Sequence, residues 1–468
     1  MDRLFEGVEV RSTRGDVSGT EVSSVELDSR RVEPGALFFC VPGEHVDGHD
    51  YAPGAVAAGA VGLMVERPLA LSVPQVVVGP GRARPAMAAA AATFYGHPAE
   101  SLVTVGVTGT NGKTTVTHLV AAILGAAGKP CAVIGTLDGA RTTPEAPVIE
   151  RLLDEARRRG RVAAALEVSS HALTQSRVDG ICFDAAVFTN LGHDHLDHHR
   201  TMEAYFAAKA RLFEPARTKL AVVNTDDRFG ARLAKETAVP VVGFGAADAT
   251  EIESVAGRTT FRWHARKVQM RLTGAYHVAN AVAAATTAVA LGVDDDTVVE
   301  GLHDAAPVTG RFEVVGSSGA VTVVVDYAHT PDGLAVALDS ARVLAGAGRV
   351  LCVFGCGGDR DRAKRPEMGA TAAAKADVTV VTSDNPRHED PGAIIAEILA
   401  GVDGAGTVLV EADRGAAISE AVNRAEPGDV VVVAGKGHET EIEIGDERVG
   451  FDDRVVAAEA LRRRGGGA

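Results

Sequence analysis

The run TGTNGKTT at residues 108–115 combines a glycine-rich turn with a lysine and hydroxyl side chains. Backbone N–H groups and the start of a helix can surround a phosphate in such a turn, with Lys113 on the phosphate and the Thr114 hydroxyl on Mg²⁺. The common form of this loop has glycine at the position of Val107, so the spacing here is a variant. The run predicts a site for a nucleoside triphosphate, and the alternative is an ordinary turn between a strand and a helix.

Acidic and histidine side chains follow two other apolar runs. Glu167 closes the run 163–166, and a stretch with four histidines, 192–199, follows the run 185–188. Ligands bind at the carboxyl ends of the strands in a parallel sheet, where a carboxylate suits Mg²⁺. The histidine-rich stretch could supply one histidine and one aspartate beside Mg²⁺, a set of zinc ligands or a solvent-exposed turn, and its composition leaves these three open.

These side chains need strands and helices that bring them together. An apolar run at 102–107 precedes the glycine turn, and a helix is expected from residue 113 to about residue 127. Further apolar runs alternate with helical spacers, which predicts parallel sheets in an α/β fold. The other expected strands are 36–41, 61–65, 76–78, 163–166, 185–188, 220–223, 321–325, 349–354, 378–381, 408–410 and 430–433.

Chain length and punctuation divide the sequence into three expected domains. At about 150 residues per domain, the 468 residues correspond to roughly three. We expect a small N-terminal α/β domain at 1–97, a central domain at 98–308 and a C-terminal domain at 309–468, the last two each with a parallel sheet. The arginine- and glycine-rich tail, 462–467, is expected to be disordered.

The composition excludes several classes of protein. Hydrophobic residues make up 46% of the chain, so every domain can form a core and a wholly disordered chain is excluded. The net charge of −15 argues against a nucleic-acid partner. The N-terminus lacks the features of a signal peptide and no apolar run approaches ~20 residues, so we expect a cytoplasmic protein without a membrane span.

Five cysteines, an odd number, favour reduced thiols, and we expect Cys352 and Cys356 to lie in the core or a loop rather than on a metal.

Five motifs together resemble the Mur ligases, which are ATP-dependent amide-bond ligases that extend the stem peptide of cell-wall peptidoglycan. The motifs are TGTNGKTT at 108–115, EVSSH at 167–171, Asn190 with DHLD at 194–197, DYAHTPD at 326–332 and AGKGHE at 434–439. The match begins at residues 28–30 and covers nearly the whole chain. The resemblance implies a UDP-binding N-terminal domain, a central P-loop ATPase domain, a Rossmann-like C-terminal domain that binds an amino acid, and a monomer.

The resemblance implies an ATP and Mg²⁺ site in the central domain. Lys113 would contact the phosphates, while Thr114 and Glu167 would bind one Mg²⁺ and His195 a second. Lys209 matches a lysine that the family carbamylates with CO₂. A carbamate is an anion that can bind Mg²⁺, whereas an ammonium group cannot. By itself, Lys209 would be interpreted as a charge on a helix surface.

The same resemblance implies further nucleotide contacts. Asn280 would contact adenine, although His277 stands where many relatives have asparagine, so we expect adenine contacts to differ in detail. Arg311 and Asp326 would lie near the phosphates and the ribose. Without the resemblance, Arg311 would be interpreted as part of a hinge ion pair and Asp326 as a turn residue. The other implied contacts are Gly109, Thr110, Asn111, Gly112 and Thr115.

Two groups of substrate contacts are implied as well. The residues that would hold a muramoyl dipeptide are Thr142, Thr143, Ser169, Gln175 and Arg177, while Ser29 would lie in the uridine-binding domain. The residues that would hold the incoming amino acid are Arg360, Asp384, Asn385, Pro386, Arg387, Gly435 and Glu439. The run DNPR at 384–387 has the form found in ligases that use meso-diaminopimelate. This amino acid carries one more carboxylate than lysine, and an arginine can pair with it through two N–H groups. A turn after a strand is the simpler interpretation of the run.

The implied reaction adds meso-diaminopimelate to the D-glutamyl residue of UDP-N-acetylmuramoyl-L-alanyl-D-glutamate through an acyl phosphate made with ATP. One alternative is a related ligase with another acceptor, such as a lysine-adding enzyme or a folate polyglutamate synthase. Arg387 and the run TTP at 142–144 argue against it. Another alternative is a nucleotide-dependent binding protein without catalysis, and the combination of Glu167, His195 and Lys209 argues against that.

Overall fold

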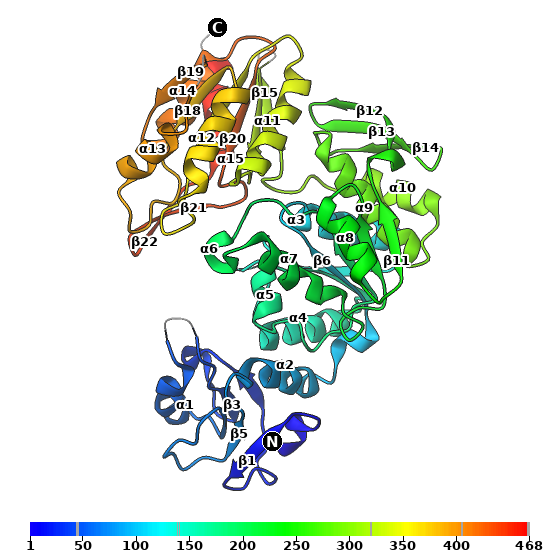
Figure 1. Cartoon of the computed structure of the whole chain (residues 1–468), viewed down its shortest axis with the longest axis vertical. Helices are drawn as coiled ribbons and strands as arrows, with labels where there is room; N and C mark the ends of the chain where they lie inside the picture. The colour runs from blue at the N-terminus through cyan, green and yellow to red at the C-terminus, as the bar shows by residue number, and fades with distance from the viewer. Residues whose placement is uncertain (44–45, 138, 140, 319–320, 404–405, 466–468) are drawn as a thin grey trace.

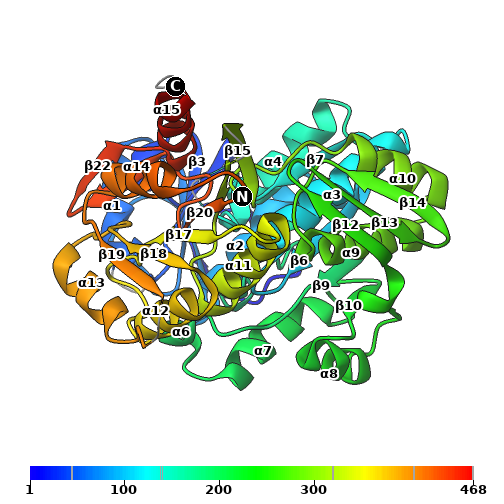
Figure 2. The same cartoon turned by 90° about the horizontal axis from the view of Figure 1, so that it is seen from above.

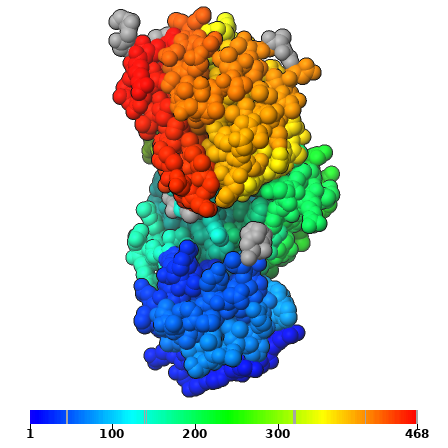
Figure 3. All heavy atoms as spheres, turned by 90° about the vertical axis from the view of Figure 1, so that its left-hand side faces the viewer, coloured from blue at the N-terminus to red at the C-terminus, as the bar shows by residue number. Residues whose placement is uncertain are grey.

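The structure is a computed structural model that describes residues 1–43, 46–137, 139, 141–318, 321–403 and 406–465. Three α/β parts follow one another along the chain, and Figure 1 shows them from bottom to top in sequence order. The space-filling view in Figure 3 has the same order. Every strand expected from an apolar run is present. The expected α/β fold class is therefore confirmed, while the domain limits after residues 97 and 308 stay predictions.

The N-terminal sheet has the strand order β1-β5-β4-β3-β2, with only the edge strand β1 antiparallel among these five. Its strands are β1 (Val10–Arg14), β2 (Ser24–Glu26), β3 (Ala36–Phe39), β4 (Gly62–Val65) and β5 (Gln75–Val78). Its helices are α1 (Ala52–Ala57) and α2 (Ala83–Phe94). Strands β3 to β5 are buried on both faces, which gives continuous apolar runs in the sequence. The polar edge strands β1 and β2 lack such runs and were not predicted.

The central sheet has six parallel strands in the order β11-β10-β9-β6-β8-β7. These strands are β6 (Val103–Thr108), β7 (Cys131–Ile134), β8 (Ala163–Glu167), β9 (Ala185–Phe188), β10 (Ala221–Asn224) and β11 (Val241–Phe244). The helices are α3 (Lys113–Ala126), α4 (Ala146–Arg158), α5 (Ser170–Thr174), α6 (Leu196–His199), α7 (Met202–Ala210) and α8 (Arg228–Glu236). Because the strands are parallel, the glycine turn after β6, Glu167 at the end of β8 and Asn190 after β9 lie at the same edge.

An antiparallel sheet and two helices extend the central part. They are β12 (Thr250–Val255), β13 (Arg258–Trp263), β14 (Arg266–Met270), α9 (Tyr276–Ala290) and α10 (Asp295–Asp304). The three strands were not predicted. In β13, buried Phe261 and Trp263 alternate with polar side chains, so no continuous apolar run marks the strand.

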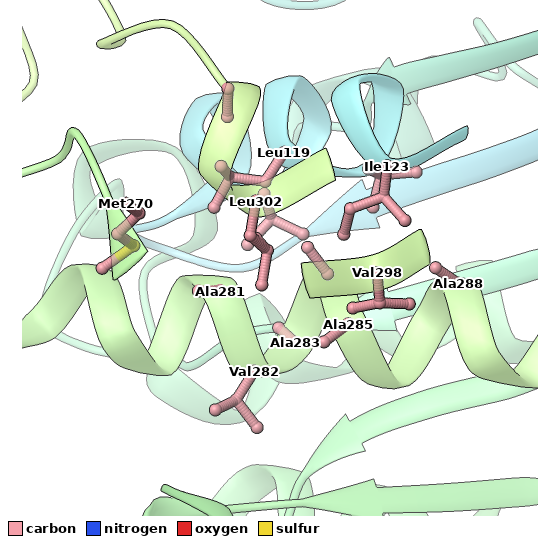
Figure 4. Packing of buried hydrophobic residues seen from close by; sticks show 14 of the residues in the cluster. Leu119, Ile123, Met270, Ala281, Val282, Ala283, Ala285, Ala288, Val298 and Leu302 are labelled. Atoms are coloured by element: carbon pink, nitrogen blue, oxygen red, sulfur yellow. The ribbon is translucent and has the colours of Figure 1, made fainter. Parts of the chain in front are cut away.

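Helices α3, α9 and α10 pack together, and this contact fixes the direction of the helix that follows the glycine turn. Figure 4 shows Leu119 and Ile123 of α3 near Val298 and Leu302 of α10. Helix α9 contributes mainly alanine to the same core, which allows close packing. An ideal Cβ on Gly301 of α10 would lie only 2.5 Å from Ile123 Cα, so the two helices approach closely at this glycine.

The C-terminal sheet has the order β15-β16-β20-β17-β18-β19 and is parallel except for the edge strand β15. The strands of this sheet are β15 (Glu313–Ser318), β16 (Val321–Asp326), β17 (Val350–Phe354), β18 (Val378–Val381), β19 (Thr407–Val410) and β20 (Val430–Ala434). A separate hairpin consists of β21 (Glu441–Ile444) and β22 (Glu447–Gly450). The helices are α11 (Pro331–Ala345), α12 (Lys364–Lys375), α13 (Pro391–Leu399), α14 (Arg414–Arg424) and α15 (Asp453–Gly465). Helices α11, α12 and α13 cover one face of the sheet, and α14 and α15 cover the other (Figure 2).

The end of the chain differs from the expectation. Helix α15 continues through residues 462–464, so the prediction of a disordered tail was wrong for these arginines, and residues 466–467 lie outside the described residues. Leu461 is buried in the core beneath α14, and Arg464 Nη1 donates to the carbonyl oxygen of Val422 at 2.8 Å. Both contacts involve residues distant in sequence, which the composition of the tail could not reveal.

Two expectations from composition concern cysteines and membranes. Cys352 and Cys356 are buried in the core between the C-terminal sheet and its helices, which confirms their interpretation as core residues. Within the described ranges, no helix combines the length and the apolarity needed to cross a membrane.

Replacing Gly301 with alanine should destabilise the central part. The added Cβ would overlap the Ile123 backbone, and overpacking of a core contact costs about 1–3 kcal/mol. Gly125→Ala in α3 is the matched control, because nothing lies within 4 Å of its ideal Cβ. Urea unfolding should place Gly301→Ala below the wild type and Gly125→Ala at or above it. Equal stability of the two variants would contradict the close contact between α3 and α10.

Candidate active site

A cavity of about 510 Å³ lies between the central and C-terminal parts. Its walls come from the turn after β6, from the carboxyl ends of other central strands, from α9 and from segments around β16 and α11. The lining residues with predicted roles are Thr110, Asn111, Gly112, Lys113, Thr114, Thr115, Thr142, Glu167, Ser169, His195, Asn280, Arg311 and Asp326. The structure therefore brings most of the predicted nucleotide residues, and two of the predicted muramoyl residues, to one cavity.

The turn between β6 and α3 brings its backbone close to neighbouring groups. Gly109 has a φ of +149° and Gly112 a φ of +86°. An ideal Cβ would lie 1.9 Å from Thr189 Oγ1 at Gly109, and 2.5 Å from Asn280 Oδ1 at Gly112, so both positions require glycine. Val107 stands where the common form of the loop has glycine, and it is fully buried in β6. This position therefore belongs to the sheet and not to the turn. Backbone N–H groups at the start of α3 remain for a phosphate.

Two lysines meet at one backbone oxygen of this turn. Lys113 Nζ donates to the carbonyl oxygens of Gly109 and Thr110 at 2.9 and 2.8 Å. Lys209 Nζ, from α7, donates to the same Gly109 oxygen at 2.8 Å and is 1% exposed, so it lies beneath the turn and not on a helix surface. Burial lowers the pKa of Lys113, and it lowers the pKa of Lys209 well below the usual value, with repulsion from Lys113 adding to the effect. Two ammonium groups at one oxygen are thus disfavoured, and the strain is relieved when Lys209 is neutral or when an anion binds at the turn.

A carboxylate and a hydroxyl stand beside the turn. Glu167 accepts hydrogen bonds from Thr114 Oγ1 at 2.8 Å and from the backbone N–H of Thr136 at 2.7 Å. Arg311 Nη2 donates to Thr114 Oγ1 at 3.0 Å. Mg²⁺ takes oxygen ligands, commonly one or two carboxylates with water and substrate phosphates. Thr114 and Glu167 therefore fit the predicted metal role.

The histidine-rich stretch forms a cluster of packed rings. The rings of His171 and His195 lie edge to face with centroids 4.9 Å apart, and those of His198 and His199 are 4.7 Å apart. In the described part of the chain, no three His, Cys, Asp or Glu side chains are placed to share a metal ion. This arrangement does not match the four tetrahedral ligands of a structural zinc site. His195 lines the cavity with Asp194, at 3.4 Å from its carboxylate, which fits one histidine and one aspartate beside Mg²⁺ and substrate.

The residues predicted to bind the nucleoside surround the hinge between the two parts. Asn280 of α9 and Asp326 at the end of β16 both line the cavity. Asp326 accepts hydrogen bonds from two backbone N–H groups at 2.7 and 2.8 Å, and burial raises its pKa. His277 is fully buried, and its Nε2 lies 3.2 Å from the carbonyl oxygen of Arg311. His277 therefore supports the hinge backbone, while Asn280 faces the cavity.

Four of the predicted muramoyl-dipeptide residues, Thr143, Ser169, Gln175 and Arg177, are joined by hydrogen bonds, and the residue predicted in the uridine domain lies apart from them. Arg177 Nη1 donates to the carbonyl oxygen of Thr143 at 2.8 Å, and Nη2 donates to Gln175 Oε1 at 2.7 Å. The Ser169 N–H donates to Thr143 Oγ1 at 3.0 Å, which joins this group to the cavity wall. Arg177 Nη2 also forms an ion pair with Glu145 Oε1 at 2.9 Å, and Nε is buried without a hydrogen-bond partner among the described residues. Ser29 lies apart, in a 3₁₀ turn of the N-terminal part.

The predicted amino-acid residues gather at the carboxyl ends of β17, β18 and β20, which are neighbouring strands. Lys436 is fully buried and donates to Asn385 Oδ1 and Glu439 Oε2, both at 3.0 Å. Asn385 Nδ2 donates in turn to Glu439 at 2.9 Å. An ideal Cβ on Gly435 would lie 2.5 Å from Asp384 Oδ2, so only glycine permits this approach. The turns after β18 and β20 therefore form one bonded unit.

Arg387 belongs to the same cluster and has two protein partners. Its Nη1 donates to the carbonyl oxygen of Gly358 at 2.8 Å, and its Nε donates to Glu443 Oε2 at 2.7 Å. A guanidinium carries five N–H donors, so these bonds leave donors for a ligand carboxylate. Pro386 is buried beside it, and Arg360 is exposed on the loop after β17.

Comparison with protein families and known proteins agrees with these motifs. Residues 21–110 match "Mur ligase family, catalytic domain", residues 107–288 match "Mur ligase middle domain", and residues 310–437 match "Mur ligase, glutamate ligase domain". A protein of Geobacillus thermodenitrificans (strain NG80-2) is 45% identical over 470 residues, which cover 95% of this chain and 96% of the relative. The chain belongs to the Mur ligase family.

Other relatives extend this comparison for the Mur ligase. The Geobacillus protein is named UDP-N-acetylmuramoyl-L-alanyl-D-glutamate--2,6-diaminopimelate ligase, and a protein of Listeria monocytogenes serotype 4b (strain F2365) with this name is 42% identical over 99% of both chains. A solved structure of an enzyme with the same name is 33% identical, with a TM-score of 0.64 over 95% of both chains. MurF from Acinetobacter baumannii has a TM-score of 0.71 at 22% identity, over 99% of this chain and 98% of that one, which shows a shared fold.

Several residues that line the cavity of this Mur ligase were not among the predicted site residues. They are Thr136, Asn190, Asp194, Tyr327, His329 and Asp332. All except Thr136 stand inside the sequence motifs, so the motifs were the signal that could have found them. The Tyr327 ring lies 4.3 Å from the guanidinium carbon of Arg311, and Asp332 accepts a hydrogen bond from the His193 N–H at 3.2 Å. Thr136 follows β7, where no motif marks it.

Replacing Gly112 with alanine should weaken ATP binding while the enzyme stays folded. The new Cβ would displace Asn280 and strain a backbone with φ of +86°. Gly128→Ala is the matched control, because its φ is +69° and nothing lies within 4 Å of its ideal Cβ. Calorimetric titration with ATP and Mg²⁺ should show at least about tenfold weaker binding for Gly112→Ala, or 1.4 kcal/mol, and unchanged binding for the control. Equal affinities in both variants would mean that the nucleotide does not contact this turn.

Proposed function

We propose that this Mur ligase uses ATP to join meso-diaminopimelate to the D-glutamyl residue of UDP-N-acetylmuramoyl-L-alanyl-D-glutamate. The main observation behind this proposal is that the phosphate turn and the cluster formed by Asn385, Lys436 and Glu439 lie on the two sides of one hinge. Tyr327 connects them, because it lines the cavity and its ring lies 5.1 Å from that of His438, next to Glu439. The names of the full-length relatives support the same activity.

The reaction has two steps. The D-glutamyl side-chain carboxylate attacks the γ-phosphorus of ATP, the bond to the β–γ bridging oxygen breaks, and ADP leaves. The amine of diaminopimelate then attacks the acyl carbon, the bond from that carbon to the phosphate oxygen breaks, and the nitrogen loses a proton as the amide forms. Lys113 and the backbone N–H groups of the turn stabilise the charge of the phosphoryl group. No protein nucleophile is required.

Thr114 and Glu167 are the residues that would hold Mg²⁺. An ion bound there would neutralise charge on the phosphate oxygens. Arg311 reaches Thr114 from the hinge, so it connects this position with the C-terminal part. His195 stands on the cavity wall as the residue we assign to a second ion.

Arg177 is the side chain that we assign to a carboxylate of the muramoyl dipeptide. Its Nη atoms are held by Thr143, Gln175 and the Glu145 carboxylate, and its Nε is buried without a hydrogen-bond partner among the described residues. Ser169 and Thr142 continue this surface along the cavity wall. We assign the uridine end to Ser29 and the domain at 1–97, ATP to the domain at 98–308 and the amino acid to the domain at 309–468.

We include a carbamate on Lys209 in the proposal. Its amine is buried with a pKa well below the usual value, so the neutral form that attacks CO₂ is favoured. The attack forms a nitrogen–carbon bond and releases a proton. The resulting anion would offset the positive charge of Lys113, which shares the Gly109 oxygen with Lys209.

Both walls of the cavity come from one chain, so we propose that the enzyme acts as a monomer. We place it in the cytoplasm because its reaction consumes ATP.

Mass spectrometry of a mixture with ATP, Mg²⁺, the dipeptide nucleotide and diaminopimelate tests the function: we expect the tripeptide nucleotide with equal amounts of ADP and phosphate. Absence of product with every amino acid would favour a binding protein without catalysis.

Lys209→Ala should reduce turnover at least about a hundredfold, or 2.7 kcal/mol, because a carbamate metal ligand is lost. Added acetate or formate should restore part of the rate by supplying a carboxylate in the vacated space. Lys219→Ala, which removes an exposed lysine of the same part, is the control and should keep the wild-type rate. Removal of CO₂ from the buffer should lower the wild-type rate as well. A wild-type rate in Lys209→Ala would end the carbamate proposal.

Arg387→Ala should raise the KM for diaminopimelate and leave the KM for ATP almost unchanged. Charge-assisted hydrogen bonds contribute roughly 1.5–3 kcal/mol each, so two of them account for a preference of about a hundredfold over lysine. The variant should therefore reduce the ratio of kcat/KM for diaminopimelate to kcat/KM for lysine. Arg448→Ala is the control, because this exposed arginine lies 3.4 Å from the same Glu443. An unchanged preference in Arg387→Ala would show that another group selects the substrate.

A further inference from the structure

Arg365, the second residue of α12, is a fully buried arginine outside the predicted site. Its Nη1 and Nη2 donate to the two carboxylate oxygens of Glu389 at 2.9 and 2.8 Å. Nη1 also donates to Glu397 at 2.8 Å, and Nη2 to the carbonyl oxygen of Gly357 at 3.1 Å. One guanidinium therefore ties the loop after β17, which contains Gly357, to the turn after β18, which contains Glu389.

The two segments joined by Arg365 carry Arg360 and Arg387, and further hydrogen bonds align them side by side. The Gly358 N–H donates to the carbonyl oxygen of Asn385 at 2.9 Å. The Gly358 carbonyl oxygen accepts a hydrogen bond from Arg387 Nη1 at 2.8 Å. Gly358 is therefore bonded to the neighbouring turn through both its N–H and its carbonyl oxygen. The Asp359 N–H donates to Glu389 Oε1 at 2.6 Å, the oxygen that also binds Arg365. Glu389 is thus the common partner of the buried arginine and of the exposed loop.

Both segments hold a non-glycine residue in the left-handed region of the backbone. The φ of Asp359 is +52° and that of Arg387 is +51°. An ideal Cβ on Gly358 would lie 1.9 Å from the carbonyl oxygen of Pro386, so the segments touch at backbone level. Residues in such conformations persist where the surrounding structure fixes them strongly. The buried guanidinium below Gly357 and Glu389 supplies that constraint.

We infer that Arg365 is the positioning residue for the amino-acid site: through Glu389 and Gly357 it fixes the backbone from which Arg360 and Arg387 extend. The inference rests on the proposed function and adds a residue to its substrate selectivity. Arg365 does not touch the cavity that contains the phosphate turn, so its effect belongs to the amino acid and not to ATP. The planar fork of arginine is required, because a lysine ammonium cannot bind both oxygens of Glu389 and the Gly357 carbonyl in one plane.

Steady-state kinetics of Arg365→Met, Arg365→Lys and Glu389→Gln with ATP, the dipeptide nucleotide and either diaminopimelate or lysine tests the inference. In Arg365→Met the KM for diaminopimelate should rise about thirtyfold and the preference over lysine should fall at least about tenfold. The kcat and the KM for ATP should stay within about threefold, which a general loss of structure would not produce. Arg365→Lys should recover little of the preference, and Glu389→Gln should lower it by about threefold to tenfold.

Arg342→Met is the matched control, because it removes an arginine of α11 that binds Asp377 and the Gly348 carbonyl in the same domain, away from the amino-acid cluster. It should keep the wild-type preference. The preference is a ratio of kcat/KM values, so the fraction of folded enzyme cancels, and Glu389→Gln decides the matter if Arg365→Met does not fold.

An Arg365→Met or Glu389→Gln enzyme with the wild-type KM and preference for diaminopimelate would overturn the inference while leaving the proposed function intact. A wild-type enzyme that forms no product with diaminopimelate would overturn both.

Discussion

Lys113 and Lys209 donate hydrogen bonds to one atom, the carbonyl oxygen of Gly109. Two ammonium groups at one oxygen repel each other, and the repulsion is relieved when one group becomes neutral or when an anion binds beside them. Lys209 is buried beneath the turn, where its charge is hardest to keep, whereas Lys113 lines the cavity. A phosphate bound from the cavity side would supply such an anion, and a neutral Lys209, or the carbamate that we propose there, would relieve the repulsion from below.

The rest of the architecture positions partners around that oxygen. The parallel central sheet places Glu167 next to the turn, and the packing of α9 and α10 against α3 fixes the direction of the helix that begins at Lys113. The hinge brings Arg311 to Thr114. The C-terminal sheet presents the carboxyl ends of β17, β18 and β20, where Arg365 and Lys436 hold the turns of the amino-acid cluster. The cavity thus lies at the carboxyl ends of the central strands, and the amino-acid cluster lies at the carboxyl ends of three parallel strands of the C-terminal sheet.

Buried parallel strands such as β6 and β20 could be predicted because both faces are covered, which leaves continuous apolar runs in the sequence. The half-exposed strands β12 to β14 carry no such signal. The phosphate turn was predictable because its residues are adjacent, and a family resemblance extended the prediction to separate motifs. Contacts across long separations were not visible: Lys209 is 100 residues from Gly109, and Glu145 pairs with Arg84 of α2 and with Arg177. Only the folded chain shows which lysine is buried and that Arg177 and Arg365 each retain a buried Nε without a hydrogen-bond partner among the described residues.

Transfer of the γ-phosphoryl group to the D-glutamyl carboxylate is the step on which the other assignments depend. A dipeptide nucleotide labelled with ¹⁸O in that carboxylate reports on it directly, because the oxygen between carbon and phosphorus leaves with phosphate when the amide forms. We predict one ¹⁸O atom in each inorganic phosphate released, measured by mass spectrometry alongside the tripeptide product. Unlabelled phosphate released together with that product would contradict the acyl-phosphate route.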